Sequence, residues 1–155
     1  MKRLMIARCM ALVTVVGTAI ATATVQATPP AVTVSGGGTA SFDFVDGLTS
    51  QFSIGAVIAD DGEVQGHFMC MIVAVVTISG EITEGTLNDD GSVTFSGVGH
   101  GIDHILGEPF EDCDFTVTLW SGGPGVGRFL YSDCVVPPPG DAETVEAGKI
   151  KIKVH

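Results

Sequence analysis

The sequence predicts an all-β protein: a small antiparallel β-barrel, or a barrel-like sandwich, of about eight strands that follows a cleaved signal peptide. Two observations predict this fold class. Apolar and polar residues alternate with a period of two in most segments, which is the period of a strand with one buried face. Turn residues separate these segments, above all glycine, which accounts for 21 of the 155 residues. No segment after the leader combines helical spacing with capping residues.

The first segment, residues 1–27, has the features of a secretory signal peptide. A basic start is followed by an apolar run over Met10–Ile20 and by Val25-Gln26-Ala27, where signal peptidase requires small residues. A membrane anchor needs about 20 apolar residues, and this run is shorter. We therefore expect residues 28–155 to form a single all-β domain that is secreted, either to the periplasm or outside the cell. The basic residues of the leader are Lys2, Arg3 and Arg8.

The charge of the chain excludes several classes of partner. The full sequence has 7 basic and 18 acidic residues, and removal of the leader leaves 7 − 3 = 4 basic residues and a formal charge of 4 − 18 = −14. Such a surface repels polyanions, so no nucleic acid is expected as a partner. Aromatic residues make up only 6% of the chain, too few for the aromatic girdles of a membrane barrel, so no membrane insertion is expected.

The predicted strands take up most of the chain after the leader. The run Phe68–Ile78 is apolar at both parities and predicts either a pair of strands or one long bent strand covered on both faces. Its β-branched residues argue against a helix. In the last strand, three lysines alternate with Ile150, Ile152 and Val154, which puts the charges on one face. The other predicted strands are Thr39–Phe44, Gln51–Ile54, Ser92–Phe95 and Cys113–Trp120, and the last is Lys149–Val154.

Turn residues mark the connections between these strands. Asp60-Asp61-Gly62 and Asp89-Asp90-Gly91 each precede a strand containing valine, and Asp-Gly favours the positive φ angles of tight hairpins. Gly122–Gly125 predicts a third hairpin turn. Cys134–Gly148 is proline-rich and acidic, and we expect it to be a long loop.

Three cysteines remain after the leader, and an exported domain favours a disulfide between two of them. If Gly122–Gly125 is a hairpin tip, facing residues have numbers that sum to about 247, so Cys113 lies opposite Cys134 at a distance that a disulfide can bridge. A bridge between Cys70 and Cys113 is the alternative. The absence of a Cys-x-x-Cys spacing argues against a redox role and for a structural one.

One polar segment has residues that could ligate a metal ion. His100, Asp103, His104 and Glu108 lie close together in the sequence, and imidazoles with carboxylates are zinc ligands. Cupin barrels use His and Glu in a similar segment, but their His-x-His pair is missing here. Residues four apart on a strand are about 13 Å distant. We therefore predict a solvated polar loop and no metal or other cofactor, with these four residues as the candidates should a metal site exist.

Several glycine-based motifs follow one another in an order that resembles the bacterial exported domains called post-choice-of-anchor (post-COAP) domains. The resemblance covers most of residues 34–155 and implies an exported β-domain, but no reaction. Two features depart from it: Ser121 and Arg128 stand where acids are expected, and Cys113 and Cys134 are additions. The motifs are Gly36-Gly37-Gly38-Thr39, Phe42–Phe44, Asp61–Phe68, Val93–Gly99, Phe115–Leu119 and Gly148–Ile152.

These observations favour a secreted, non-enzymatic β-domain that is a structural or binding module of the cell envelope or the extracellular space. It would act through an envelope protein, self-association or a small ligand. The alternative is a small barrel that binds or cyclises a hydrophobic small molecule, as barrels of the allene-oxide-cyclase and dirigent types do. No catalytic motif such as Gly-x-Ser-x-Gly is present, so we expect no enzyme activity in the first case.

Overall fold

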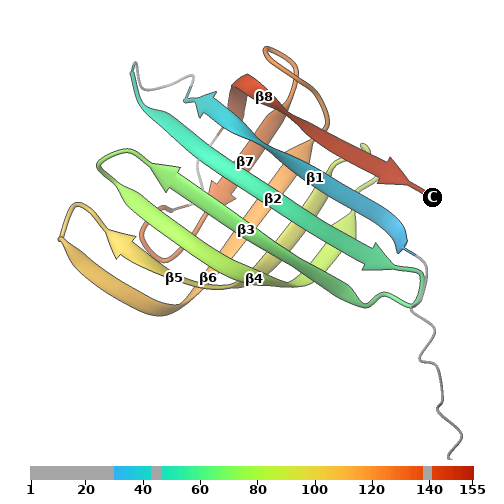
Figure 1. Ribbon diagram of the computed structural model, residues 1–155, viewed down its shortest axis with the longest axis horizontal. Coiled ribbons are helices and arrows are strands. Elements are labelled where there is room, and N and C mark those ends of the chain that lie inside the picture. Colours follow the sequence, from blue (N-terminus) through green and yellow to red (C-terminus); the bar gives the residue numbers. More distant parts are fainter. Residues whose placement is uncertain (1–29, 43–46, 138–140) are drawn as a thin grey trace, which may run out of the picture.

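A computed structural model describes residues 30–42, 47–137 and 141–155, and the predicted signal peptide lies outside them. The described chain is all-β and forms one antiparallel sheet that closes into a barrel in the order β1 to β8, each strand next to its neighbour in sequence (Figure 1). This confirms the predicted fold class. The strands are β1 (Pro30–Ser41), β2 (Thr49–Ala59), β3 (Val64–Ile72), β4 (Val76–Leu87), β5 (Val93–Asp103), β6 (Glu108–Trp120), β7 (Arg128–Ser132) and β8 (Glu143–Val154).

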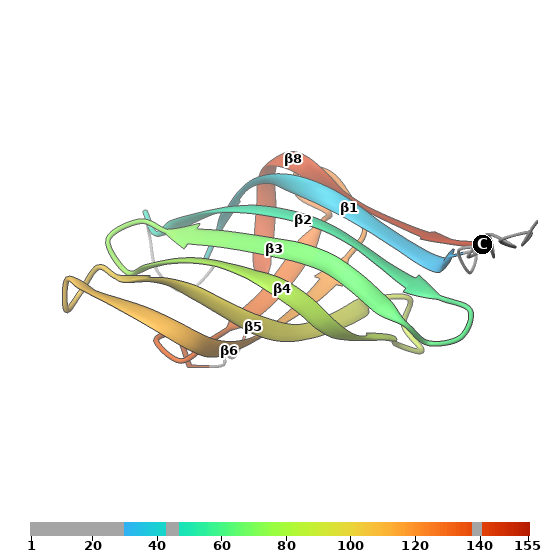
Figure 2. The same cartoon turned by 60° about the horizontal axis from the view of Figure 1, so that its bottom comes forward.

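The closure of the ring is uneven. From β1 to β6, successive strands pair over long stretches, and β1 also pairs with β8 from Val32 to Ser41. By contrast, β7 pairs with β8 at only two positions, Arg128 with Thr144 and Phe129 with Glu143. One further bridge joins Gly122 to Ile150. Figure 2 shows β1 and β8 side by side at the top, above the curved sheet of β2 to β6.

Alternating side chains from every strand point into the barrel and form its core. The rings of Phe68 and Phe115 stack with centroids 5.4 Å apart, and Phe68 also meets Tyr131 at 5.5 Å. Phe52 packs against Phe129 at 4.5 Å. These aromatic contacts join β2 and β3 to β6 and β7 across the interior, which holds the two sides of the ring together.

Two glycine positions show how closely the strands approach. Gly38 on β1 faces Gly148 on β8, and Gly148 has a φ of 95°, in the left-handed region that favours glycine. A Cβ atom on Gly148 would lie 2.0 Å from the carbonyl oxygen of Gly37. A Cβ atom on Gly97 would lie 2.0 Å from the carbonyl oxygen of Glu81 and 2.8 Å from Cζ of Phe115. Side chains are therefore excluded from both places.

The structure decides between the alternatives for the central apolar run. Phe68–Ile78 is a strand pair: β3 ends at Ile72, β4 begins at Val76, and Ala74 in the turn has a φ of 62°. Both predicted Asp-Gly turns are present as hairpin connections. The lysine-bearing strand also has the predicted alternation, with Ile150 buried between exposed lysines.

Two sequence predictions about the chain between the strands were wrong. The long loop was predicted to extend from Cys134 to Gly148, but β8 already begins at Glu143. The acidic, proline-rich composition suggested a loop, whereas Glu143 and Val145 both lie on β8, point into the barrel and are buried. The polar loop predicted around His100–Glu108 is also much shorter, because β5 continues to Asp103 and β6 starts at Glu108.

Candidate functional site

A group of polar side chains lies inside one end of the otherwise apolar barrel. Ser50 on β2, Cys70 on β3, Tyr131 on β7 and Glu143 on β8 are all buried. The strands bring them together because Cys70 faces Phe52, two residues after Ser50, and Glu143 faces Phe129, two residues before Tyr131. Since residues two apart share a face of a strand, all four side chains point inward. We call these four residues and Asp133 the interior polar cluster.

Glu143 is the most unusual member of this cluster. Its side chain is only 1% exposed, and burial raises the pKa of its carboxyl group from 4.5 to about 7, although a hydrogen bond from Ser50 opposes the rise. The Ser50 hydroxyl donates this short hydrogen bond to Oε2 of Glu143. Near neutral pH the carboxyl group is therefore present in both protonation states, so it can either donate or accept a proton.

Tyr131 and Asp133 form the second polar pair. The Tyr131 hydroxyl donates a short hydrogen bond to Oδ2 of Asp133. Burial raises the pKa of the Tyr131 phenol above its usual range, and the hydrogen bond to Asp133 raises it further. The phenol therefore remains protonated and acts as a hydrogen-bond donor, never as a base, at ordinary pH.

Cys70 is the one free cysteine among the described residues, and it is fully buried. Burial raises the pKa of its thiol well above the usual range, and the negative charges of Glu143 and Asp133 raise it further. A thiol in such surroundings stays protonated and is a poor nucleophile. Its contribution to the cluster is to fill space next to Glu143 as a weakly polar group.

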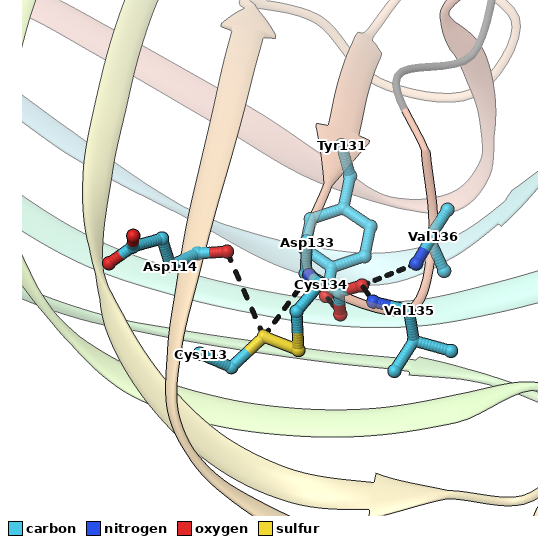
Figure 3. Close-up of a disulfide and its surroundings, with 7 residues drawn as sticks. All are labelled: Cys113, Asp114, Tyr131, Asp133, Cys134, Val135 and Val136. Atoms are coloured by element: carbon cyan, nitrogen blue, oxygen red, sulfur yellow. Dashed lines mark hydrogen bonds between the residues drawn. A yellow bond between two sulfur atoms is a disulfide. The ribbon is translucent and has the colours of Figure 1, made fainter.

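The disulfide lies next to this cluster (Figure 3). Cys113 and Cys134 are joined, with Cα atoms 5.7 Å apart, and a disulfide is compatible with an oxidising, exported environment. Oδ1 of Asp133 accepts hydrogen bonds from the backbone N–H groups of Val135 and Val136, at 2.7 and 2.6 Å. The tight turn that follows β7 therefore presents Cys134 to β6 and Asp133 to Tyr131.

The register that led to this pairing was wrong by one residue. Trp120 faces Arg128, not Gly127, so facing residues on β6 and β7 have numbers that sum to 248. The reason is the shape of the glycine turn, in which the N–H groups of both Val126 and Gly127 donate to the carbonyl oxygen of Gly123. Cys134 still reaches Cys113 because it lies beyond the end of β7, in the turn, where the ladder no longer fixes its position.

The four candidate metal ligands are separated in the structure. His100 is exposed on β5, whereas Oδ1 of Asp103 accepts hydrogen bonds from the backbone N–H groups of the β5–β6 turn. His104 bonds the Thr77 hydroxyl at 2.9 Å through Nε2. Glu108 faces Asp103 across the hairpin and is exposed. Within the described parts of the chain, no three His, Cys, Asp or Glu side chains are grouped so that they could hold a metal ion.

A second polar arrangement lies on the outer face, across β3 and β4. His67 bonds the Ser79 hydroxyl through Nε2 at 2.8 Å and faces Glu81 through Nδ1 at 3.4 Å. The contacts from Ser79 to His67 to Glu81 follow the order of a Ser-His-acid triad. A hollow of about 150 Å³, lined in part by His100, lies beside these residues. However, β4 is paired on both sides at Ser79, so its backbone N–H group is not available as an oxyanion donor. The arrangement also lies open to water, with His67 52% exposed.

Sequence reasoning missed the interior polar cluster because its members are far apart in the chain. Glu143 lies in the segment that was predicted to be a long acidic loop, and Tyr131 is the one tyrosine of the chain, with no motif around it. The parity of Glu143 relative to Val145 was the available signal, because both lie on the same face of a strand.

None of the residues that the structure describes belongs to a helix long and apolar enough to cross a membrane. Comparisons of the chain with family models, with curated protein sequences and with solved structures give no match.

Proposed function

We propose that this protein is an exported, non-enzymatic binding module whose ligand site is the interior polar cluster. The ligand would be a small hydrophobic molecule with one polar group that can form a hydrogen bond with the Glu143 carboxyl. The barrel would have to open to admit it, because Glu143 is only 1% exposed in the structure. The resemblance to post-COAP domains, with the predicted leader, supports export, and the disulfide between Cys113 and Cys134 is compatible with it. The function would be exercised in the cell envelope or outside the cell.

The observation that carries this proposal is the burial of Glu143. Placing a carboxyl group in an apolar interior costs several kcal/mol unless its hydrogen-bonding capacity is met. Ser50 supplies one hydrogen bond, while the buried core beyond the interior polar cluster is mainly aromatic or aliphatic. An apolar residue at position 143 would give a more stable barrel, so the acid is better explained by an interaction with a ligand than by folding alone.

The surroundings of Glu143 define the kind of ligand. Phe129 faces Glu143 and packs against Phe52 with its ring tilted, and such aromatic surroundings favour apolar groups. The Tyr131 hydroxyl is already bonded to Asp133. The carboxyl group of Glu143 is therefore the group that would orient the ligand, and a ligand with a hydroxyl or amine N–H would satisfy it.

The proposal can be tested with a neutral fluorescent probe, N-phenyl-1-naphthylamine, which is apolar apart from one N–H group. We expect the full-length exported protein to bind the probe and Glu143→Gln to weaken binding by about tenfold, the effect of losing one hydrogen bond to a charged group. Glu146→Gln is the matched control, because Glu146 lies on the same strand but is exposed. Equal binding by both variants, or no binding by the parent protein, would contradict the proposal.

A second candidate function is conversion of the bound molecule, as in the cyclising barrels. The observation that favours it is the pKa of Glu143, about 7, which suits a general acid or base at neutral pH. Incubating a hydrophobic allylic epoxide with the parent protein and with Glu143→Gln, followed by chiral analysis of the products, tests this candidate. A product that forms equally with both proteins would rule it out.

A further inference from the structure

Among the residues that the structure describes, the C-terminal half of β8 has a neighbouring strand on one side only. On the β1 side it pairs continuously, with Ile152 facing Val34 and Val154 facing Val32. On the other side, the last described partner is Gly122, whose N–H donates to the carbonyl oxygen of Ile150 at 3.0 Å and whose carbonyl oxygen accepts from the Ile150 N–H at 2.8 Å. Figure 1 shows this half of β8 running beside β1 toward the C-terminus. We call Ile150–Val154 the β8 edge.

The backbone groups of the β8 edge are oriented for strand pairing. In an antiparallel ladder, the N–H and C=O groups of alternate residues point to opposite sides. Ile150 bonds Gly122, so Ile152 and Val154 also point away from β1, while the His155 N–H donates to the Ala31 carbonyl oxygen on the β1 side. Among the residues with described positions, no backbone group pairs with Ile152 or Val154 on the open side. The edge can therefore accept another strand.

The outer face of the same segment carries a concentrated positive charge. Lys149, Lys151 and Lys153 are all exposed, and they account for three of the four basic residues after the leader. The only ion pair found in the described chain is between His67 and Glu81, so none of the three lysines has an acidic partner there. This is unusual in a chain with 18 acidic residues. The facing residues on β1 are Gly37, Ser35 and Thr33, which carry no charge.

A groove accompanies the open edge and its lysines. It has a volume of about 450 Å³ and is lined by Ser121, Gly122 and Gly123 on one side and by Lys149–Lys153 on the other. Glycine at positions 122 and 123 leaves the wall without side chains, so a peptide backbone can approach closely. The groove thus combines free backbone groups, small residues and ammonium groups in one place.

We propose that the β8 edge binds an extended acidic segment of a partner protein, which adds to the barrel as a strand. Backbone hydrogen bonds to Ile152 and Val154 would supply affinity. Side chains of the added strand would alternate, and those on the outer face, about 6.6 Å apart, would lie next to the lysines. The segment recognised is therefore one in which Asp or Glu occupies every second position and smaller or apolar residues lie between them.

The charges and edges of the chain argue against a second copy as the occupant. Antiparallel pairing of two β8 edges would bring lysines together on one face, which is unfavourable. The acidic part of β6, Glu108–Asp114, is poorly suited to strand pairing, because Pro109 lacks an N–H group and Asp112 has a φ of 52°. Binding at the β8 edge involves the outer surface of the barrel and does not require a ligand at Glu143.

The test uses an end-blocked, fluorescein-labelled peptide of alternating Glu and Val, with binding to the full exported protein followed by fluorescence anisotropy. Replacing the three lysines by Gln should weaken binding by about tenfold at low salt, since each exposed ion pair contributes a severalfold effect at most. Replacing them by Arg should leave binding unchanged. A peptide with Lys in place of Glu is expected not to bind.

A second pair of variants tests strand addition separately from charge. Val154→Pro removes the N–H group on the open side, whereas Val154→Thr keeps it, and Val154 is 66% exposed, so both variants should fold. We expect Val154→Pro to weaken peptide binding severalfold and Val154→Thr to have no effect. Amide NMR shifts at Ile152 and Val154 should move when the peptide is added to the parent protein.

Three results would overturn the proposal. The first is an absence of peptide binding by the parent protein. The second is equal binding by Val154→Pro and Val154→Thr, which would indicate attraction of charge without strand pairing. The third is self-association of the Gln variant through this edge with peptide binding undiminished, measured by sedimentation, which would show that the lysines protect the edge from other copies.

Discussion

The buried carboxyl group of Glu143 predicts a characteristic dependence of stability on pH. Its pKa is about 7 in the folded protein, against a usual value of 4.5 that applies to the unfolded chain. Between these values the folded protein binds more protons than the unfolded chain, so the free energy of unfolding falls as pH rises. This pKa difference contributes about 3 kcal/mol to the free energy of unfolding. The contribution is fully present below pH 4.5 and is lost once the pH exceeds 7.

Replacing Glu143 by Gln isolates this effect, because Gln keeps the volume and can still bond the Ser50 hydroxyl. We expect the variant and the parent protein to be about equally stable near pH 4, and the variant to be more stable by about 3 kcal/mol at pH 8. For a domain of this size the gain corresponds to roughly 10 °C in Tm. The measurement is urea unfolding with the disulfide intact, repeated at half-unit steps from pH 4 to pH 8.

The difference between variant and parent matters more than either profile, since other titrating groups cancel in it. Glu146→Gln provides the baseline, because it removes an exposed carboxyl group from the same strand. If the stability difference for Glu143→Gln is independent of pH, or matches that of Glu146→Gln, the carboxyl group titrates as it does in water. The assignment of Glu143 to a desolvated interior position would then be wrong.

Three further predictions concern the rest of the barrel. Replacing Cys113 and Cys134 by Ser should lower the free energy of unfolding by about 3 kcal/mol, because the disulfide no longer restricts the unfolded chain between these two residues. Unchanged urea midpoints would contradict a structural role for the disulfide. Gly97→Ala should destabilise the protein by about 1–3 kcal/mol through overpacking. Gly55→Ala is the control: no atom lies within 4 Å of the Cβ position of Gly55, so stability should change by less than about 0.5 kcal/mol. Equal urea midpoints for the two variants would show that Gly97 is not closely packed. Cys70 should react with iodoacetamide only in urea, as followed by mass spectrometry, and rapid labelling of the native protein would show that the thiol is accessible.

Much of the barrel could be predicted from local patterns. The alternation in the last strand, the β-branched residues between Phe68 and Ile78 and the two Asp-Gly turns identified elements that the structure contains, because each depends on a few neighbouring residues. The register between β6 and β7 could not be predicted correctly from the sequence. Seven residues, 121–127, lie between the paired residues Trp120 and Arg128, one more than the predicted register leaves, and no local pattern distinguishes these cases.

The candidate site was beyond local reasoning. Ser50 and Glu143 are 93 residues apart in the chain, and only closure of the sheet makes them neighbours. The composition of Cys134–Gly148 led to the wrong prediction, because an acidic and proline-rich segment usually indicates a loop. The polar residues that did cluster in the sequence, around His100, lie on an exposed hairpin where strand geometry separates them.

The brief pairing of β7 with β8 has a consequence for the dynamics of the barrel. Among the described residues, only two residue pairs join β7 itself to β8, and the turn before β7 adds backbone hydrogen bonds between Gly122 and Ile150 and between Gly125, Gly127 and Val145. The amide hydrogen of Phe129 should therefore exchange with solvent well before those of the long β1–β5 ladders. One of the two pairs contains Glu143 itself. Each transient separation there would admit water to the carboxylate, so we expect proton exchange at this acid to be coupled to opening of the cylinder.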